Sequence, residues 1–213
     1  MPASGEGIGP YPLHVTPIGG TTLREELDDY TLVDTLHQHF LALYPAGERP
    51  RLLYRSQSHD TLWLELALPL REESSGGRER FTVRQVYLDG HDRPQVLVTL
   101  ESSSNGISSG TQWRSQYLLD LTPRKPLLLL YGLMREMIEV FPAYAALHGD
   151  TLAPEDTETG WERTLTVKRH ELVVDEAEPL GDSPGTSTLT TMPAGRYRYR
   201  QGQLFRIDPS HNR

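Results

Sequence analysis

The stretch from Phe81 to Leu100 constrains the fold more than any other part of the sequence. It contains two apolar runs, 81–88 and 95–100, and the charged segment between them begins with Asp89-Gly90. Two such runs joined by a short connection with an Asp-Gly pair are typical of a β-hairpin. The stretch therefore predicts a hairpin, and we expect the chain around it to be mainly β.

Other segments show the same preference for strands. Between Leu62 and Leu68, leucines alternate with other residues, which is the period of a half-buried strand. Comparable runs occur at 52–54, 116–121, 165–174 and 197–207, and polar loops are expected at 71–80, 101–110, 151–160 and 176–184. This pattern predicts antiparallel hairpins in a propeller-like or sandwich arrangement.

One segment near the N-terminus has the periodicity of a helix instead. Its apolar residues recur at steps of three or four and would form one stripe on a helix. The stripe comprises Leu23, Leu27, Tyr30, Val33, Leu36, Phe40 and Leu43. Thr22 and Glu25 fit a capping box at its start, and Pro45 ends the run. We therefore expect one amphipathic helix in this region.

The domain organisation follows from these patterns. Residues 1–20 are rich in Gly and Pro and predict an extended arm, whereas 21–213 predict a single mainly β domain. Residues 126–148 are ambiguous, because the run LLLLYGLMREMIEVF fits one helix or two successive strands. Gly132 and Ile138 favour strands, and a short helix at 142–148 stays open as an alternative.

The C-terminal segment predicts a hairpin with two different faces. Tyr197 and Tyr199 share an apolar face with Phe205 and Ile207 only if the loop between the strands has an odd number of residues. We therefore expect a three-residue turn at 201–203, with a positive φ at its glycine. The other face then carries Arg196, Arg198, Arg200 and Arg206.

Four guanidinium groups on one face repel one another by roughly several tenths of a kcal/mol for each close pair. An acidic group should therefore lie beside them. One alternative is an internal neighbour such as Asp175, Glu176 or Glu178. The other alternative is the acidic surface of a partner protein.

The composition excludes several classes of function. With 29 acidic and 21 basic residues, the formal net charge is -8, which disfavours binding to nucleic acid. The absence of cysteine excludes disulfides, thiolate nucleophiles and thiolate zinc sites. No apolar window is long enough for a transmembrane helix, and the first residues lack the pattern of a secretory signal. The sequence decides neither the compartment nor the oligomeric state.

Gly106 to Gly110 matches the G-x-S-x-G pattern of a nucleophile elbow, with Ser108 in the position of the nucleophile. An elbow requires an apolar helix directly behind the serine, but 111–116 is polar and leads into a strand. A serine hydrolase that uses Ser108 or Ser109 with one of the histidines is therefore an alternative function, and no catalytic residue is assigned.

Asp89, His91 and Asp92 could supply metal ligands from one turn, although an Asp-Gly pair also forms a good hairpin turn without any metal. His37 and His39 would point away from each other on a helix, where paired ligands need steps of three or four. We favour the structural interpretation of the turn and expect neither a metal nor another cofactor.

The opening hairpin resembles a known repeat. Residues 87–98, followed by a Ser- and Gly-rich loop and the strand at 116–120, are similar to the repeat of FG-GAP and VCBS-like proteins. The pattern of that repeat is D-x-D-G-D-G-x-P-E-V-x-V, in which the acidic turn binds calcium. Tyr87, His91 and Gln95 depart from it, and one remaining carboxylate, Asp89, cannot assemble the roughly six to eight oxygen ligands of calcium. The resemblance therefore implies a turn that persists without its metal.

The resemblance implies a β-propeller-type protein of the bacterial envelope, in the periplasm or outside the cell. Because similar small envelope proteins include inhibitors that act as immunity proteins against secreted toxins, our first hypothesis is a non-enzymatic binding protein with a protein partner. The candidate partner-binding residues are Ser103, Asn105, Ser108, Arg196, Arg198, Arg200 and Arg206. A structural subunit of a larger assembly, with the run at 127–130 or the helix stripe covered by a neighbour, is a further alternative.

Overall fold

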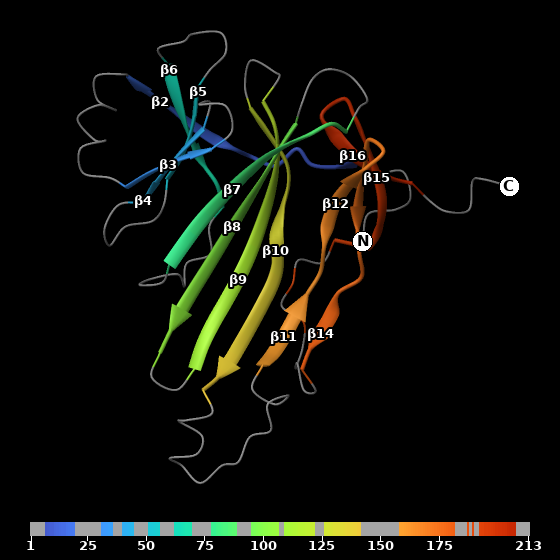
Figure 1. Cartoon of the computed structure of the whole chain (residues 1–213). Helices are drawn as coiled ribbons and strands as arrows, with labels where there is room; N and C mark the ends of the chain where they lie inside the picture. Colours follow the sequence, from blue (N-terminus) through green and yellow to red (C-terminus); the bar gives the residue numbers. More distant parts are fainter. Residues whose placement is uncertain are drawn as a thin grey trace, which may run out of the picture.

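The computed structural model describes residues 7–19, 31–35, 40–44, 51–55, 62–69, 78–88, 95–106, 109–121, 126–141, 158–181, 187, 189 and 192–207. In this part of the chain, antiparallel strands form three open sheets and no helix is present, which confirms the mainly β prediction. Figure 1 shows the strands of the largest sheet running downward from between the other two sheets.

The three sheets are named by their place in the chain. The central sheet has the order β14-β11-β10-β9-β8-β7, with β7 at Arg78–Val86, β8 at Gln95–Asn105, β9 at Ser109–Asp120, β10 at Leu127–Val140, β11 at Glu158–Glu162 and β14 at Glu178–Leu180. The N-terminal sheet has the order β2-β6-β5-β4-β3, with β2 at His14–Gly19, β3 at Thr31–Thr35, β4 at Phe40–Tyr44, β5 at Arg51–Arg55 and β6 at Leu62–Ala67. The C-terminal sheet has the order β1-β16-β15-β13-β12, with β1 at Gly7–Ile8, β12 at Leu165–Lys168, β13 at Glu171–Val174, β15 at Gly195–Arg200 and β16 at Gln203–Ile207.

The central sheet is buried on both faces where the other sheets cover it. Its first face carries Val98 and Leu119, which pack with Leu52 and Leu66 of the N-terminal sheet in one hydrophobic cluster, the first core. Because side chains alternate along a strand, every second residue of these strands points to the opposite, second face. This double burial explains why Val96, Leu97 and Val98 of β8 are consecutive apolar residues.

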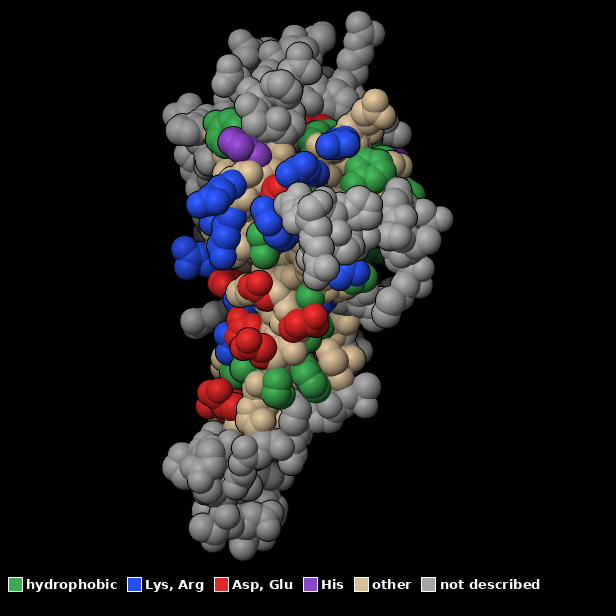
Figure 2. Space-filling model, turned by 90° about the vertical axis from the view of Figure 1, so that its right-hand side faces the viewer, with side chains coloured by type: hydrophobic (Ala, Val, Ile, Leu, Met, Phe, Trp, Pro, Cys, Tyr) green, Lys and Arg blue, Asp and Glu red, His purple; other side chains and the backbone are tan. Residues whose placement is uncertain are grey.

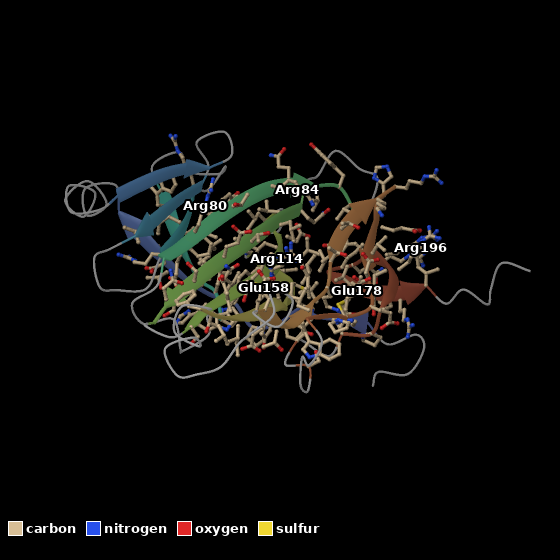
Figure 3. All side chains as sticks on the ribbon, turned by 60° about the horizontal axis from the view of Figure 1, so that its bottom comes forward. Arg80, Arg84, Arg114, Glu158, Glu178 and Arg196 are labelled. Atoms are coloured by element: carbon tan, nitrogen blue, oxygen red, sulfur yellow. The ribbon has the colours of Figure 1, made fainter. Side chains whose placement is uncertain are left out.

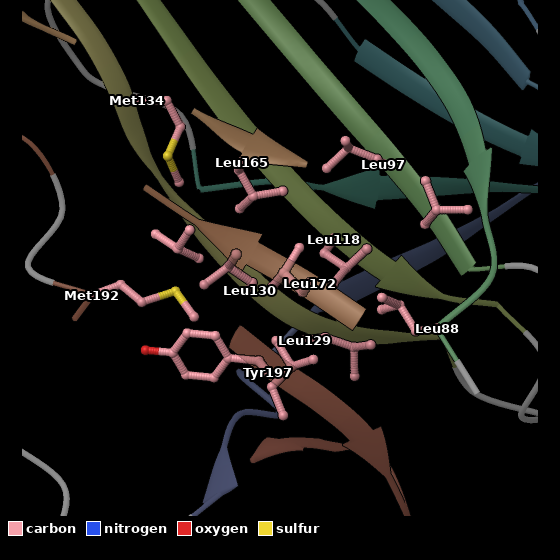
Figure 4. Packing of buried hydrophobic residues seen from close by; sticks show 13 residues of the cluster. Leu88, Leu97, Leu118, Leu129, Leu130, Met134, Leu165, Leu172, Met192 and Tyr197 are labelled. Atoms are coloured by element: carbon pink, nitrogen blue, oxygen red, sulfur yellow. The ribbon is translucent and has the colours of Figure 1, made fainter. Parts of the chain in front are cut away.

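The second face packs against the C-terminal sheet in a separate cluster, the second core. Leu97 and Leu118 of the central sheet meet Leu172, Tyr197 and Leu204 there, and Figure 4 shows most of these side chains pointing toward one another. Each fully buried leucine contributes roughly 1.5–3 kcal/mol relative to an exposed one. The two cores therefore hold the three sheets together through the shared strands of the central sheet.

The predicted hairpin at 81–100 is confirmed by the pairing of β7 with β8. Phe81 lies opposite Leu100, and Val86 lies opposite Gln95. The side chain of Gln95 is buried, and its Oε1 accepts a hydrogen bond from the backbone N–H of Leu88 at 3.0 Å. The turn itself, with Asp89, lies outside the described residues.

The ambiguous stretch after residue 126 is a strand. Leu127–Val140 forms β10 between β9 and β11, with irregular register between Leu128 and Leu130 and between Leu133 and Arg135. The preference of its β-branched residues for a pleated surface therefore predicted the structure correctly, although one long strand replaces the two that we expected. Residues 142–148 lie outside the described residues.

The predicted N-terminal helix is not confirmed. Residues 31–35 and 40–44, which include Val33, Phe40 and Leu43 of its apolar stripe, form the antiparallel pair β3 and β4. Thr31, Val33 and Thr35 are β-branched and weak helix formers, so pairing in a sheet prevails over an accidental periodicity of three and four. Residues 20–30 and 36–39, with the proposed capping box, lie outside the described residues.

The polar loop expected at 101–110 is also corrected. Strand β8 continues to Asn105 and β9 begins at Ser109, with Ser103 opposite Gln112 and Asn105 opposite Gly110. The backbone ladder needs no apolar side chains, so Ser and Asn extend these strands beyond the cores. Likewise, β7 begins at Arg78 within the loop expected at 71–80.

Candidate functional site

The C-terminal hairpin differs from the predicted one by a single residue in its turn. Arg200 pairs with Gln203, so the turn is Gln201-Gly202 rather than a three-residue turn. Gln201 has a φ of 49° and Gly202 a φ of 82°, which are the two left-handed positions of a type I′ turn. The prediction was wrong because it placed Phe205 on the core face, where the fully buried Leu204 lies opposite Tyr199.

This register leaves three of the four predicted arginines on one face. Arg196, Arg198 and Arg200 are exposed on the outward face of β15. Arg206 lies opposite Tyr197, so it belongs to the other face, where its Nη2 donates to the carbonyl oxygen of Ala194 at 2.9 Å. The prediction of four arginines on one face is therefore corrected.

A lysine of the neighbouring strand joins the three arginines. Lys168 ends β12 opposite Glu171, one residue beyond Val167 of the second core, so its side chain points outward. We call Lys168, Arg196, Arg198 and Arg200 the basic face. In Figure 2, Lys and Arg side chains gather in the upper part of this side of the molecule, and Asp and Glu side chains lie below them.

One carboxylate lies within the basic face. Glu171 is only 5% exposed, and it forms ion pairs with Arg196 and, through Oε1, with Nε of Arg198 at 2.9 Å. Burial alone would raise the pKa of Glu171, but the hydrogen bonds and charges of Arg198 and Arg196 outweigh it and lower the pKa. The side chain is therefore an anion at neutral pH.

An internal acidic neighbour therefore exists, and it is Glu171 rather than one of the three residues named as examples. Asp175 accepts a hydrogen bond from the Thr164 hydroxyl, while Glu171 reaches the arginines because Leu172 lies opposite Tyr197 in the sheet. A pairing between strands so distant in sequence left no local signal. The apolar pairs Leu165/Val167 and Leu172/Val174 on either side of Arg169-His170 do signal the hairpin that places Lys168 opposite Glu171, but they say nothing of the arginines of β15.

The basic face keeps an excess of positive charge. The face contains four cationic side chains and one carboxylate, so three positive charges remain uncompensated within it. Arg196 and Arg198 leave 60% and 54% of their side-chain surface exposed, and Arg200 forms no ion pair with any residue that the structure describes. Each guanidinium has five N–H donors, of which Glu171 uses only a few. The face can therefore bind further acceptors.

A second charged feature crosses the central sheet. On its second face, one residue from each strand lies in register in a single transverse row: Arg80, Glu101, Arg114, Arg135, Glu162 and Glu178. Nη2 of Arg114 is 2.7 Å from Oε1 of Glu162, and Nη1 of Arg135 is 3.9 Å from its Oε2. Figure 3 labels Arg80, Arg114 and Glu178 along this row. Because its charges cancel, the row serves mainly as a ladder across the strands.

The G-x-S-x-G match spans the turn between β8 and β9. The N–H of Gly106 donates to the carbonyl oxygen of Ser109 at 2.8 Å, and Ser109 begins a strand where an elbow requires a helix. Ser108 itself lies outside the described residues. The geometry around the motif is that of a hairpin turn.

The predicted partner-binding residues do not form one surface. Ser103 is half-buried on the second face of the central sheet and Asn105 is exposed at the end of β8. Figure 1 places this end of β8 at the bottom of the molecule and β15 at the upper right. The arginines and the serine-rich turn are therefore separate candidate sites.

Within the described ranges, no group of three His, Asp or Glu side chains is arranged to hold a metal ion. The described part of the chain also contains no helix that is long and apolar enough to cross a membrane. No family model matches this sequence, and neither a curated protein nor a solved structure matches it. The candidate site therefore rests on its own geometry.

Proposed function

We propose that this chain is a non-enzymatic binding protein that recognises an acidic surface of a partner protein through its basic face. The observation that carries the proposal is the excess of three positive charges on the face of a chain whose formal net charge is -8. Like charges side by side on a sheet lower stability, and a partner with acidic groups removes that penalty. The opposite charges of the basic face and the partner also attract each other at long range.

The apolar residues between the charges support a protein partner. Phe205 lies opposite Arg198, and Val173 and Ile207 lie on either side of Arg196 in the sheet. All three are only partly buried. Arginine and aromatic side chains are enriched in protein interfaces, where arginine is also frequent among the residues that dominate binding.

The setting and the role extend the proposal further. The resemblance of residues 87–98 to FG-GAP and VCBS-like repeats supports a protein of the bacterial envelope, and an inhibitor or immunity protein is the role that fits such a setting. A partner of this kind is a secreted or envelope protein that presents Asp and Glu side chains.

The test compares two double variants that each remove two positive charges. Lys168→Gln with Arg200→Gln changes the basic face and leaves the two arginines that pair with Glu171. Arg80→Gln with Arg84→Gln is the matched control, because both residues are exposed on β7 of the central sheet. We expect wild type and control to retain one stoichiometric acidic partner from the secreted and envelope proteins of the source cells. The basic-face variant should lose it.

Salt provides the second readout, because attraction between exposed charges is screened at high ionic strength. Binding of the purified partner should weaken as salt increases, and more steeply for wild type than for the basic-face variant. Equal retention by both double variants, or repeated recovery of no stoichiometric partner, would refute the proposed function.

A further inference from the structure

The first face of the central sheet carries two tryptophans with a carboxylate between them. Trp113 of β9 and Trp161 of β11 both lie opposite Glu136 of β10, one on each side. Directly opposite residues of an antiparallel sheet point to the same face. The three side chains therefore form one transverse row, the Trp-Glu-Trp row, two residues beyond Leu100 of the first core.

The spacing of this row suits an extended ligand. Neighbouring strands are about 4.8 Å apart, so the two tryptophans attach to the sheet about 10 Å from each other. The indole Nε1 of Trp113 donates to Oε1 of Glu136 at 3.2 Å, which turns the polar edge of this ring toward the carboxylate. Two rings so far apart cannot both lie on one small ring-shaped molecule.

The surface around the row is partly accessible and mixed in character. Both tryptophans are only partly buried, and Ile138 in the next row is 42% exposed. Thr111 and Thr159 lie on either side of Ile138 and add two hydroxyl groups. Flat apolar rings, a carboxylate and hydroxyl groups thus alternate on one partly exposed sheet face.

These groups select among the possible ligands. A purely apolar partner would cover the partly exposed Glu136 without supplying hydrogen bonds to it, which is costly for a carboxylate. A sugar ring has an apolar face for the indole and hydroxyl donors for the carboxylate. We propose that the Trp-Glu-Trp row binds a neutral oligosaccharide, with each indole against a different sugar unit and Glu136 accepting hydroxyl hydrogen bonds between them.

This site is independent of the basic face, since it lies on another sheet and uses no positive charge. The two sites could serve one protein in an envelope rich in polysaccharide, but neither requires the other. A failure of the basic-face test leaves the present proposal intact.

Soluble hexasaccharides are the probes for the test. Cellohexaose, chitohexaose, laminarihexaose and maltohexaose are titrated into the full chain and followed by calorimetry and tryptophan fluorescence. The chain has three tryptophans, so the tryptophan fluorescence of the Trp63→Phe variant comes only from Trp113 and Trp161. We expect at least one hexasaccharide to bind, with an affinity that salt does not change.

Substitutions in the row then locate the site. Trp113→Ala and Trp161→Ala should each lower the affinity about tenfold or more, as the loss of a central aromatic contact does. Trp113→Phe should restore most of the affinity, because it keeps a flat ring. If an alanine variant does not fold, the leucine variant at the same position, Trp113→Leu or Trp161→Leu, is used in its place. Leucine keeps apolar volume but has no aromatic face.

The control and the contrary outcomes are equally defined. Trp63→Phe changes β6 of the N-terminal sheet and should leave the affinity unchanged. Glu136→Gln keeps a hydrogen-bond acceptor and should lower the affinity less than Glu136→Ala does. Absence of binding by all four hexasaccharides at millimolar concentration would overturn the proposal. Binding that persists in both tryptophan variants would also overturn it. Hexalysine is titrated as a cationic comparison, and a chain that binds hexalysine in a salt-sensitive manner but none of the hexasaccharides would overturn it as well.

Discussion

Glu171 is the residue on which the basic face depends structurally. Its carboxylate is nearly buried, and two arginines compensate its charge. We expect Glu171→Gln to lower the free energy of unfolding at neutral pH by about 1 kcal/mol, since it weakens charge-assisted hydrogen bonds that are partly screened by water. Thermal unfolding measures the effect. Glu176→Gln, which removes an exposed carboxylate nearby, should change little.

The same residue gives the protein a pH dependence of known sign. The pKa of Glu171 is lowered from its ordinary value of 4.5 because the arginines outweigh the effect of burial. The stabilisation is therefore complete above that ordinary value and is lost as the pH falls through the lowered one. The stability difference between wild type and Glu171→Gln should accordingly shrink in acid. A difference that grows as the pH falls would contradict this account.

Gln95 is a second buried polar residue with a defined role. Its Oε1 accepts a hydrogen bond from the backbone N–H of Leu88. Leu88 is itself buried and lies just before the turn between β7 and β8. Gln95→Leu leaves that N–H without its acceptor, so we expect a loss of about 1–3 kcal/mol in the free energy of unfolding by denaturant. Gln112→Leu is the matched control, because Gln112 is exposed on β9. Equal losses in both variants would show that the hydrogen bond contributes nothing particular.

At the level of elements, the turn between β15 and β16 is open to improvement. Gln201 has a left-handed φ that Asn adopts more readily, and Asn-Gly is the preferred pair for a type I′ turn. Gln201→Asn should therefore raise the free energy of unfolding by about 0.4–1 kcal/mol, visible as a higher melting temperature. Gln203→Asn, at the first residue of β16, should give no gain because Asn is disfavoured in strands.

The elements also show which parts of the fold a single sequence can predict. The hairpin of β7 and β8 was predictable because two apolar runs and an Asp-Gly pair lie close together in the chain. The helix expected at 23–43 is not confirmed, since the spacing of Val33, Phe40 and Leu43 satisfied a helix as well as a sheet. Only the pairing of β4 with β5, which no local pattern encodes, distinguishes the two.

The candidate site was predictable to a similar extent. Period two placed Arg196, Arg198 and Arg200 on one face, but a single-residue error in the turn added Arg206 to them. Glu171 escaped prediction because its contact with Arg198 depends on the pairing of β13 with β15. The Trp-Glu-Trp row escaped for the same reason, as its members come from three strands.

At the scale of the whole molecule, the two cores share the strands β8, β9 and β10. Leu118 and Leu119 are adjacent on β9 and both fully buried, yet Leu118 belongs to the second core and Leu119 to the first. Because the same backbone supports both, loss of packing on one face should weaken the other. We expect Leu118→Ala and Leu119→Ala each to lower the free energy of unfolding by about 2–5 kcal/mol.

The decisive measurement is whether each variant unfolds in one transition. Trp63 lies in the N-terminal sheet, so its fluorescence in a variant with Trp113 and Trp161 both replaced by Phe reports on that sheet. Circular dichroism reports on all three sheets. Coincident transitions are expected in both leucine variants, as in a two-state protein. If Leu118→Ala shifted the circular dichroism transition and left the Trp63 signal in place, the two cores would be separate cooperative units. The sharing of β9 between them would then carry no energetic coupling.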